Sequence, residues 1–236
     1  MRKFDKLSAL AVRLDEQNLD TDQLIPARFL LKPRAEGYQK FLFHDRRFNT
    51  AGGEKADFIL NQPPFRQAKI IVSDSNSGSG SAREHAVYAL MDYGIRAVIV
   101  PSFGSIFLVN CLKNGLLPLQ ISSALAAGLR GQLRATPGSE IAIDLEQQKL
   151  TGPDGAHHHF DINPAHRHRL LEGLDDIDLT LAHSEDIAAF EKRHQAAHSW
   201  LFENPARQSP YFSSSAATFS RSSNSLNSSN GSMRSP

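Results

Sequence analysis

Hydrophobic and polar positions along the chain follow two periods, one of two residues and one of three to four. Every second position between Ile141 and Leu145 is apolar, which predicts a strand with one buried face. Apolar residues at helical spacing over 86–93, before Gly94, predict a helix. The predicted strands are residues 9–14, 70–72, 97–100, 116–121, 141–145, 149–151 and 157–162. The predicted helices are residues 86–93, 105–113, 123–134, 164–172 and 184–198, and the order indicates a mixed α/β domain.

Residues 70–100 read as one supersecondary unit. An apolar run at 70–72 precedes a glycine-rich stretch at 74–85, a helix and a second apolar run at 97–100. This order predicts a βαβ unit whose two strands are parallel. Residues 32–53 are rich in charge, aromatic residues and glycine, which predicts a long surface loop.

The composition changes near Gln208. From there to Pro236, 12 of 29 residues are serine, and such a segment buries too little apolar surface to offset its chain entropy. We therefore expect one compact domain over residues 1–207 and a disordered serine-rich tail over 208–236.

Composition and charge exclude several classes of protein. One cysteine, Cys111, excludes an internal disulfide framework and a four-cysteine metal or iron–sulfur site within this chain. An apolar run long enough to span a membrane is absent from the sequence, and the charged N-terminal segment is unlike a signal peptide, so we expect a cytoplasmic protein. The net charge of +1 argues against a nucleic-acid partner.

The glycine-rich stretch carries the clearest chemistry. Gly78 and Gly80 allow a tight turn and close approach of a ligand to the backbone, just before a predicted helix. Arg83 adds a guanidinium that can hold a carboxylate through two hydrogen bonds, and Ser81 lies near the start of the helix. The pattern lacks the lysine of a Walker A loop. Two interpretations stay open on spacing alone: a site for a small anion, or an ordinary helix cap with a flexible turn.

Several motifs in order along the chain resemble one known family. They lie at residues 18–30 (NLDTDQLIPARFL), 78–86 (GSGSAREHA), 101–107, 110–118 and 173–181. Over about residues 6–202 the chain resembles the small subunits of 3-isopropylmalate dehydratase, which are relatives of aconitase. The resemblance implies a swivelling β/β/α domain, with a mixed sheet and flanking helices, equivalent to the mobile last domain of aconitase.

The same resemblance implies a reaction and a partner. The reaction is the isomerisation of 2-isopropylmalate to 3-isopropylmalate in leucine biosynthesis, by loss and return of water, so the substrate is a small dicarboxylate. A separate large subunit would hold a [4Fe–4S] cluster, while this chain would hold neither a metal nor another cofactor.

Position by position, the resemblance also implies site residues. Ser81 matches the family's catalytic base, and Arg83 matches the arginine that binds a substrate carboxylate. Gly80 and Ala82 would offer backbone N–H groups. The complete set of implied substrate-binding residues is Arg83, Gly80, Ala82, Gly78, Arg34 and Asp22. Asp22 and its neighbour Asp20 have a second interpretation, because aspartates also favour turns.

Some positions depart from the family pattern and leave the substrate open. Ser77, Ser79, Ala82 and Ala35 stand where the family usually has other residues. One alternative is a related hydro-lyase for another branched hydroxy diacid. Another is a non-enzymatic module that binds anions or RNA, against which the balanced charge argues. The histidines at 157–159, 166 and 168 do not form a metal-ligand pattern, because consecutive residues of a strand point to opposite faces.

Overall fold

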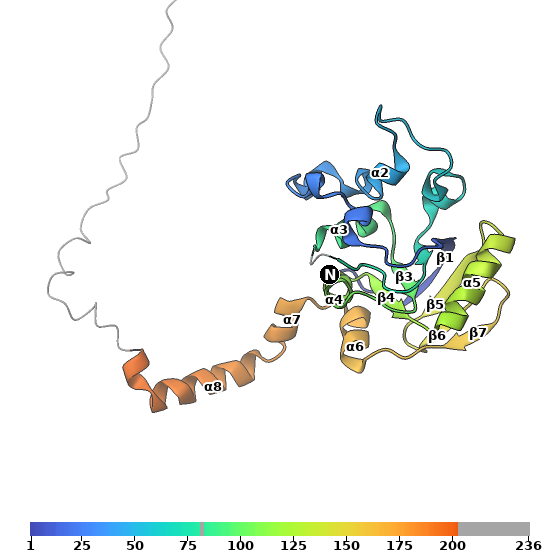
Figure 1. The fold of residues 1–236 in the computed structure, drawn as a ribbon. Helices are drawn as coiled ribbons and strands as arrows, with labels where there is room; N and C mark the ends of the chain where they lie inside the picture. Colours follow the sequence, from blue (N-terminus) through green and yellow to red (C-terminus); the bar gives the residue numbers. More distant parts are fainter. Residues whose placement is uncertain (81–82, 203–236) are drawn as a thin grey trace, which may run out of the picture. The chain divides into compact units, whose positions relative to one another are not determined.

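The computed structural model describes residues 1–80 and 83–202. Within these residues the chain forms a seven-stranded mixed sheet in the order β4-β3-β2-β1-β5-β6-β7 (Figure 1). The strands are β1 (Lys6–Arg13), β2 (Ile70–Val72), β3 (Ala97–Val100), β4 (Leu117–Gln120), β5 (Glu140–Asp144), β6 (Lys149–Thr151) and β7 (His157–His159). The mixed α/β class predicted from the sequence is confirmed.

β1 joins a parallel half of the sheet to an antiparallel half. Ala11 lies opposite Ile70 in the parallel pair with β2, and Ala9 lies opposite Ile141 in the antiparallel pair with β5. β2, β3 and β4 continue the parallel half, whereas β5, β6 and β7 form an antiparallel meander. The βαβ unit and the final hairpin predicted from the sequence are therefore both confirmed.

Neighbouring residues of the central strands enter two different apolar cores. Ile71 of β2 packs in the same core as Leu90 of α3 (His85–Tyr93), while Ile70 packs in the other core with Leu129 of α5 (Ser123–Ala135). Successive side chains of a strand point to opposite faces, so α3 and α5 cover opposite faces of the parallel half (Figure 1). Burial on both faces explains why β2 and β3 are apolar at every position.

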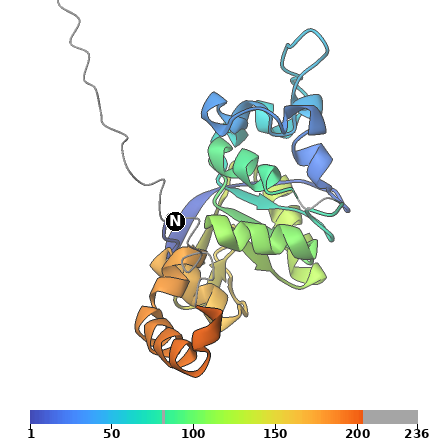
Figure 2. The same ribbon diagram turned by 90° about the vertical axis from the view of Figure 1, so that its left-hand side faces the viewer.

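Short helical segments between β1 and β2 gather at one end of the sheet (Figure 2). The prediction of a surface loop over residues 32–53 holds for most of the segment, which is exposed, but it is wrong for Tyr38, Phe41, Leu42 and Phe43, which are buried in the α3 core. These residues lie on single turns, which show neither a two-residue nor a 3.6-residue period. The segments are α1 (Thr21–Leu24), α2 (His44–Arg47) and the 3-10 turns Ala27–Phe29, Arg34–Glu36, Tyr38–Lys40, Ile59–Asn61 and Phe65–Gln67.

The remaining helices agree with the predictions except near the C-terminus. They are α4 (Ser105–Asn114), α6 (Pro164–Glu172), α7 (Asp176–Leu181) and α8 (Ser184–Ala197). The sequence analysis missed α7, whose signal is a capping box between Asp175 and Asp178. The N-cap of α8 is His183, and Ser184 is its first helical residue.

The described residues divide into two units, one over Met1–Ala182 and one that begins at His183. In the described part of the second unit, α8 precedes a 3-10 turn at Ser199–Leu201, and neither contains a buried residue. The boundary at residue 207 stays a prediction, and the expected disordered tail at 208–236 lies outside the described residues. Among described helices, none is long and apolar enough to cross a membrane.

Candidate functional site

Three polar segments meet at the carboxyl edge of the parallel strands. Residues 14–21 follow β1, residues 73–80 follow β2, and residues 101–104 follow β3. Parallel strands bring their carboxyl ends to one edge, which is where open α/β sheets bind ligands. The glycine-rich stretch singled out from the sequence is the middle segment of the three.

Backbone hydrogen bonds hold the glycine-rich segment between its two neighbours. The Gly78 N–H donates to the Leu19 carbonyl at 2.6 Å, and the Thr21 N–H donates to the Ser79 carbonyl at 3.1 Å. On the other side the Ser77 N–H donates to the Ser102 carbonyl at 3.0 Å. The pairing of β1, β2 and β3 thus continues beyond the strand ends, and the position of residues 77–79 follows from the sheet.

Gly78 is required by both conformation and packing. Its φ of +73° is in the left-handed region, and a Cβ atom there would lie 2.1 Å from the Phe107 ring. Gly80 has a φ of +93°, but a Cβ atom there would meet only the Asp20 Cβ at 3.4 Å. A small hollow of about 130 Å³ opens beside both glycines, lined by Gly78, Ser79, Gly80, Gly104, Ser105 and Ile106.

The two aspartates of the 18–30 motif have different roles. Asp20 is the N-cap of α1: its carboxylate accepts the Gln23 N–H at 2.7 Å, and the Gln23 side chain accepts the Asp20 N–H at 3.2 Å. This capping box agrees with the turn interpretation of Asp20. Asp22, in the first turn of α1, instead reaches the glycine-rich segment through Arg83.

Arg83 and Asp22 form an ion pair across 61 residues of sequence, with Arg83 Nη1 donating to Asp22 Oδ1. The Arg83 side chain is 29% exposed and that of Asp22 is 56% exposed, so the guanidinium can be reached from solvent. The structure therefore brings Arg83, Asp22, Gly78 and Gly80 of the predicted site together. Ser81 and Ala82, the other two loop residues of that site, lie outside the described residues.

Arg34 lies apart from these residues. Its Nη2 atom donates to Asp92 Oδ1 at 2.7 Å, and its guanidinium lies 4.2 Å from the centroid of the Tyr88 ring. The hydrogen bond to Asp92 raises the pKa of Arg34. Asp92 is in the last turn of α3, whereas Arg83 precedes the first turn, and a helix of nine residues is about 13 Å long.

Sequence analysis missed a second set of charged residues beneath the loops. Arg130, on α5, donates to the Ser73 carbonyl at 2.8 Å and to Asp74 Oδ2 at 2.8 Å, and its Nε lies 3.5 Å from Asp15 Oδ1. The Ser75 N–H and the nearby Arg130 charge lower the pKa of Asp74. Nothing in the spacing of these residues signals the contact, which depends on how α5 packs.

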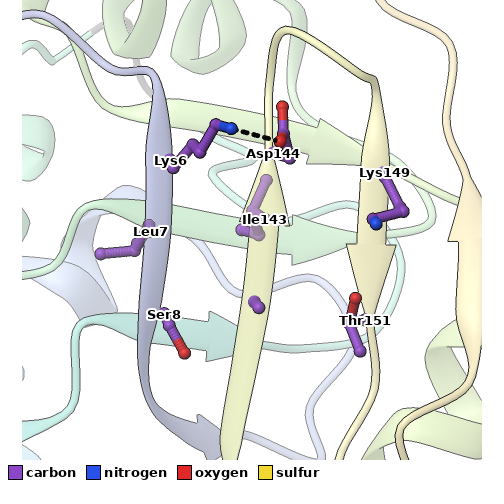
Figure 3. Close-up of a pocket in the computed structure, with 8 residues that line it drawn as sticks. Lys6, Leu7, Ser8, Ile143, Asp144, Lys149 and Thr151 are labelled. Carbon is purple, nitrogen blue, oxygen red and sulfur yellow. Dashed lines mark ion pairs between the residues drawn. The ribbon is translucent and has the colours of Figure 1, made fainter.

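A shallow hollow on the antiparallel half contains none of the predicted site residues (Figure 3). Lys6 of β1 and Asp144 of β5 form an ion pair across it, with Nζ 3.1 Å from Oδ2. The pair raises the pKa of Lys6, while the Gln147 N–H and Lys6 lower that of Asp144. Lys6 and Asp144 neutralise one another, and Lys149 on β6 is the remaining charged residue that lines the hollow (Figure 3).

The described residues do not fit an iron–sulfur cluster or a metal ion. Cys111 is fully buried among apolar side chains, and burial raises the pKa of its thiol well above the usual value. Within residues 1–80 and 83–202, no group of three histidine, cysteine or acidic side chains could hold a metal. A cluster needs several reachable thiolates, which this chain cannot supply.

Family models match three consecutive stretches of the chain. The aconitase C-terminal domain matches residues 1–124, and LeuD_N matches residues 128–164. Residues 176–204 match the C-terminal domain of the small subunit of 3-isopropylmalate dehydratase. The first stretch alone is more than half of the chain and includes every predicted site residue.

Curated relatives are similar over almost their whole length. A 3-isopropylmalate dehydratase small subunit from Gluconacetobacter diazotrophicus is 47% identical over 200 residues, covering 85% of this chain and 97% of the relative. Proteins of the same name from Gluconobacter oxydans and Rhizobium etli are each 45% identical, covering 85% of this chain and 96% and 99% of theirs.

A solved structure shares the fold. The crystal structure of 3-isopropylmalate dehydratase from Methanocaldococcus jannaschii aligns with a TM-score of 0.56 at 22% identity, over 79% of this chain and 99% of that one. The similarity in three dimensions therefore extends to a distant sequence and supports the arrangement of sheet and helices described above.

Proposed function

This chain belongs to the family of 3-isopropylmalate dehydratase small subunits in the aconitase superfamily, and on that premise we propose that it supplies the substrate-binding half of a heteromeric hydro-lyase. Its proposed substrate is 2-isopropylmalate, which the complete enzyme converts to 3-isopropylmalate for leucine biosynthesis. The observation that carries the proposal is the Arg83–Asp22 pair beside Gly78 and Gly80.

Arg83 already binds a carboxylate in this structure, and that carboxylate belongs to its own chain. A carboxylate of the substrate can take the place of Asp22 on the guanidinium, and the exposed Asp22 carboxylate can then turn to solvent. The planar guanidinium can then hold the new carboxylate through two parallel hydrogen bonds. Backbone N–H groups of the loop at Gly80 and Ala82 would bind the same end of the substrate.

The reaction needs a base that removes a proton from carbon. In the proposed sequence, Ser81 takes the proton from the carbon next to the one bearing hydroxyl, the hydroxyl group departs and isopropylmaleate forms. Water then adds with the opposite orientation, so its hydroxyl joins the carbon that lost the proton and a proton returns to the other carbon. A serine hydroxyl is a weak acid, and the adjacent Arg83 charge and the start of α3 would favour its alkoxide.

The departing hydroxyl group needs a Lewis acid, which this chain does not provide because Cys111 is its one cysteine and is buried. We therefore assign that task to a partner, a large subunit with its own [4Fe–4S] cluster. The partner must approach the carboxyl edge of β1, β2 and β3, where the loops lie. The reduced cytoplasm suits both such a cluster and the free thiol of Cys111.

The test is to purify this chain with the aconitase-like large subunit of the same organism and to load the cluster. We expect the complex, and neither subunit alone, to isomerise 2-isopropylmalate. Turnover of a different branched hydroxy diacid by a fully loaded complex that ignores 2-isopropylmalate would refute the substrate. Failure of the two chains to associate would refute the partner.

A further inference from the structure

Arg130 is a largely buried arginine that lies at the start of two of the three loops. The Arg130 side chain is 13% exposed, whereas that of Arg134, one turn further along the same helix, is 61% exposed. A charged side chain is rarely buried to this extent unless partners surround it. The identity of those partners indicates what the residue does.

The partners of Arg130 come from two different segments. One side of the guanidinium binds the Ser73 carbonyl and the Asp74 carboxylate, directly after β2, while its Nε faces Asp15, directly after β1. The same two segments are also joined to each other, since the Glu16 carbonyl accepts hydrogen bonds from the Ser73 hydroxyl and the Asp74 N–H. Arg130 thus binds the point at which both loops leave the sheet.

From that point the two segments stay paired up to the site. The Asn18 N–H donates to the Ser75 carbonyl at 3.0 Å, and further along Gly78 and Ser79 pair with Leu19 and Thr21. Asp22 follows on one segment, and residues 81–83 follow on the other. A displacement at Asp15 or Asp74 would therefore move the two halves of the site relative to one another.

We propose that Arg130 is a positioning residue for substrate binding: by fixing the starts of residues 14–21 and 73–80 together, it sets the place of Arg83 relative to Asp22. The inference rests on the proposed function, in which Arg83 binds a substrate carboxylate. Arg130 touches neither substrate nor reacting atoms and acts through the two loops.

The experiment compares three variants in the cluster-loaded complex with the large subunit. Arg130→Met removes all three contacts, and Arg130→Lys keeps the charge but cannot reach acceptors on both segments at once. Arg134→Met is the matched control, because Arg134 lies one turn along α5 and binds only Asp15, which keeps its ion pairs with Arg13 and Arg130 when Arg134 is replaced. Steady-state kinetics with 2-isopropylmalate and thermal unfolding are measured for each.

We expect Arg130→Met to lower kcat/KM by about 10-fold to about 100-fold, the loss that a small misplacement of a binding group causes. Arg130→Lys should fall between Arg130→Met and the wild type, and Arg134→Met should stay within about twofold of the wild type. Equal kcat/KM for Arg130→Met and Arg134→Met would overturn the inference. A wild-type complex inactive on 2-isopropylmalate would instead count against the proposed function.

A double-mutant cycle separates positioning from a general loss of stability. If Arg130 acts by placing Arg83, the loss caused by Arg130→Met should shrink at least about threefold in an Arg83→Lys background. Fully additive losses would overturn the inference. Should Arg130→Met fail to fold, Asp74→Asn replaces it in the cycle, since it weakens the contact from the loop side. If Asp74→Asn folds and has the kcat/KM of the wild type, or if it also fails to fold, Arg130 stabilises the fold and does not position Arg83, and the inference is overturned.

Discussion

At the scale of single residues, the Arg83 guanidinium is bound by a carboxylate of its own chain. In the proposed function, substrate binding at Arg83 exchanges one anion for another, and its free energy is the difference between two ion pairs. Asp22 is more than half exposed, so its pair with Arg83 is weak enough for the exchange. The same contact keeps the guanidinium in place before the substrate arrives.

The first prediction concerns the shape of this cation. Arg83→Lys should lower kcat/KM of the complex by roughly tenfold to a hundredfold, because a point charge loses one of two charge-assisted hydrogen bonds. The measurement is steady-state kinetics with 2-isopropylmalate. Arg28→Lys is the control, since Arg28 pairs with Asp45 away from the loop. Unchanged kinetics for Arg83→Lys would remove Arg83 from the site.

The second prediction concerns Gly78. Gly78→Ala should lower the free energy of unfolding by about 2 to 4 kcal/mol, because the new methyl group meets the Phe107 ring and φ is positive. Gly80→Ala should lower it by about 1 kcal/mol, since only φ is unfavourable there. Urea unfolding of the isolated chain measures both. Equal effects would mean that Phe107 can move aside.

The residues of the proposed site could be named individually from the sequence, but their arrangement could not. Gly78, Gly80 and Arg83 fall in one short stretch whose composition fits either a site for a small anion or an ordinary helix cap. Arg83 and Asp22 are 61 residues apart in the sequence, and the residues around each of them give no sign that the two side chains are in contact. Arg34 shows the opposite case. It lies close to Asp22 in the sequence, but its guanidinium binds Asp92 and lies apart from Arg83 and Asp22.

At the scale of elements, α1 is a single turn that depends on its cap. Asp20→Ala should lower the free energy of unfolding by about 1 kcal/mol, whereas Asp20→Asn should cost only a few tenths, because an asparagine oxygen can also accept the Gln23 N–H. Urea unfolding measures the difference. If the asparagine variant is as unstable as the alanine variant, the negative charge of Asp20, and not its hydrogen bond to the Gln23 N–H, stabilises α1.

Elements marked by a helical period or by a continuous apolar run were predicted correctly, and several short turns with neither signal were not. The continuous apolar runs of β2 and β3 identify strands buried on both faces, and the helical spacing of α3 separates them. The burial of Tyr38, Phe41, Leu42 and Phe43 was missed because single turns are too short to repeat a pattern, and it follows from their packing in the α3 core. The six residues of α7 escaped for the same reason.

At the scale of the whole molecule, acidic side chains stabilise the fold chiefly in their charged form. Six carboxyl groups of the described residues have a lowered pKa, each through hydrogen bonds from a basic side chain or from backbone N–H groups. They are Asp45, Glu54, Asp74, Asp144, Asp175 and Asp176. A lowered pKa in the folded state means that acid favours unfolding.

Asp45 gives this prediction a range of pH. The hydrogen bond from Arg28 lowers its pKa from 3.8 to about 2, so its contribution is complete above pH 4 and is lost as the pH falls towards 2. Both side chains are about half exposed, which limits the contribution to at most about 1 kcal/mol. Urea midpoints should fall between pH 5 and pH 2.5, and less steeply for Arg28→Met. A constant midpoint for the wild type would contradict the prediction.

The position of β1 at the junction of the two half-sheets has a consequence for synthesis of the protein. β1 is synthesised before either neighbour, since its parallel neighbour comes from residues 70–72 and its antiparallel neighbour from residues 140–144. Until more than half of the chain has been made, one edge of β1 stays unpaired and able to associate with other nascent chains. Any fragment that ends before residue 140 keeps that open edge permanently.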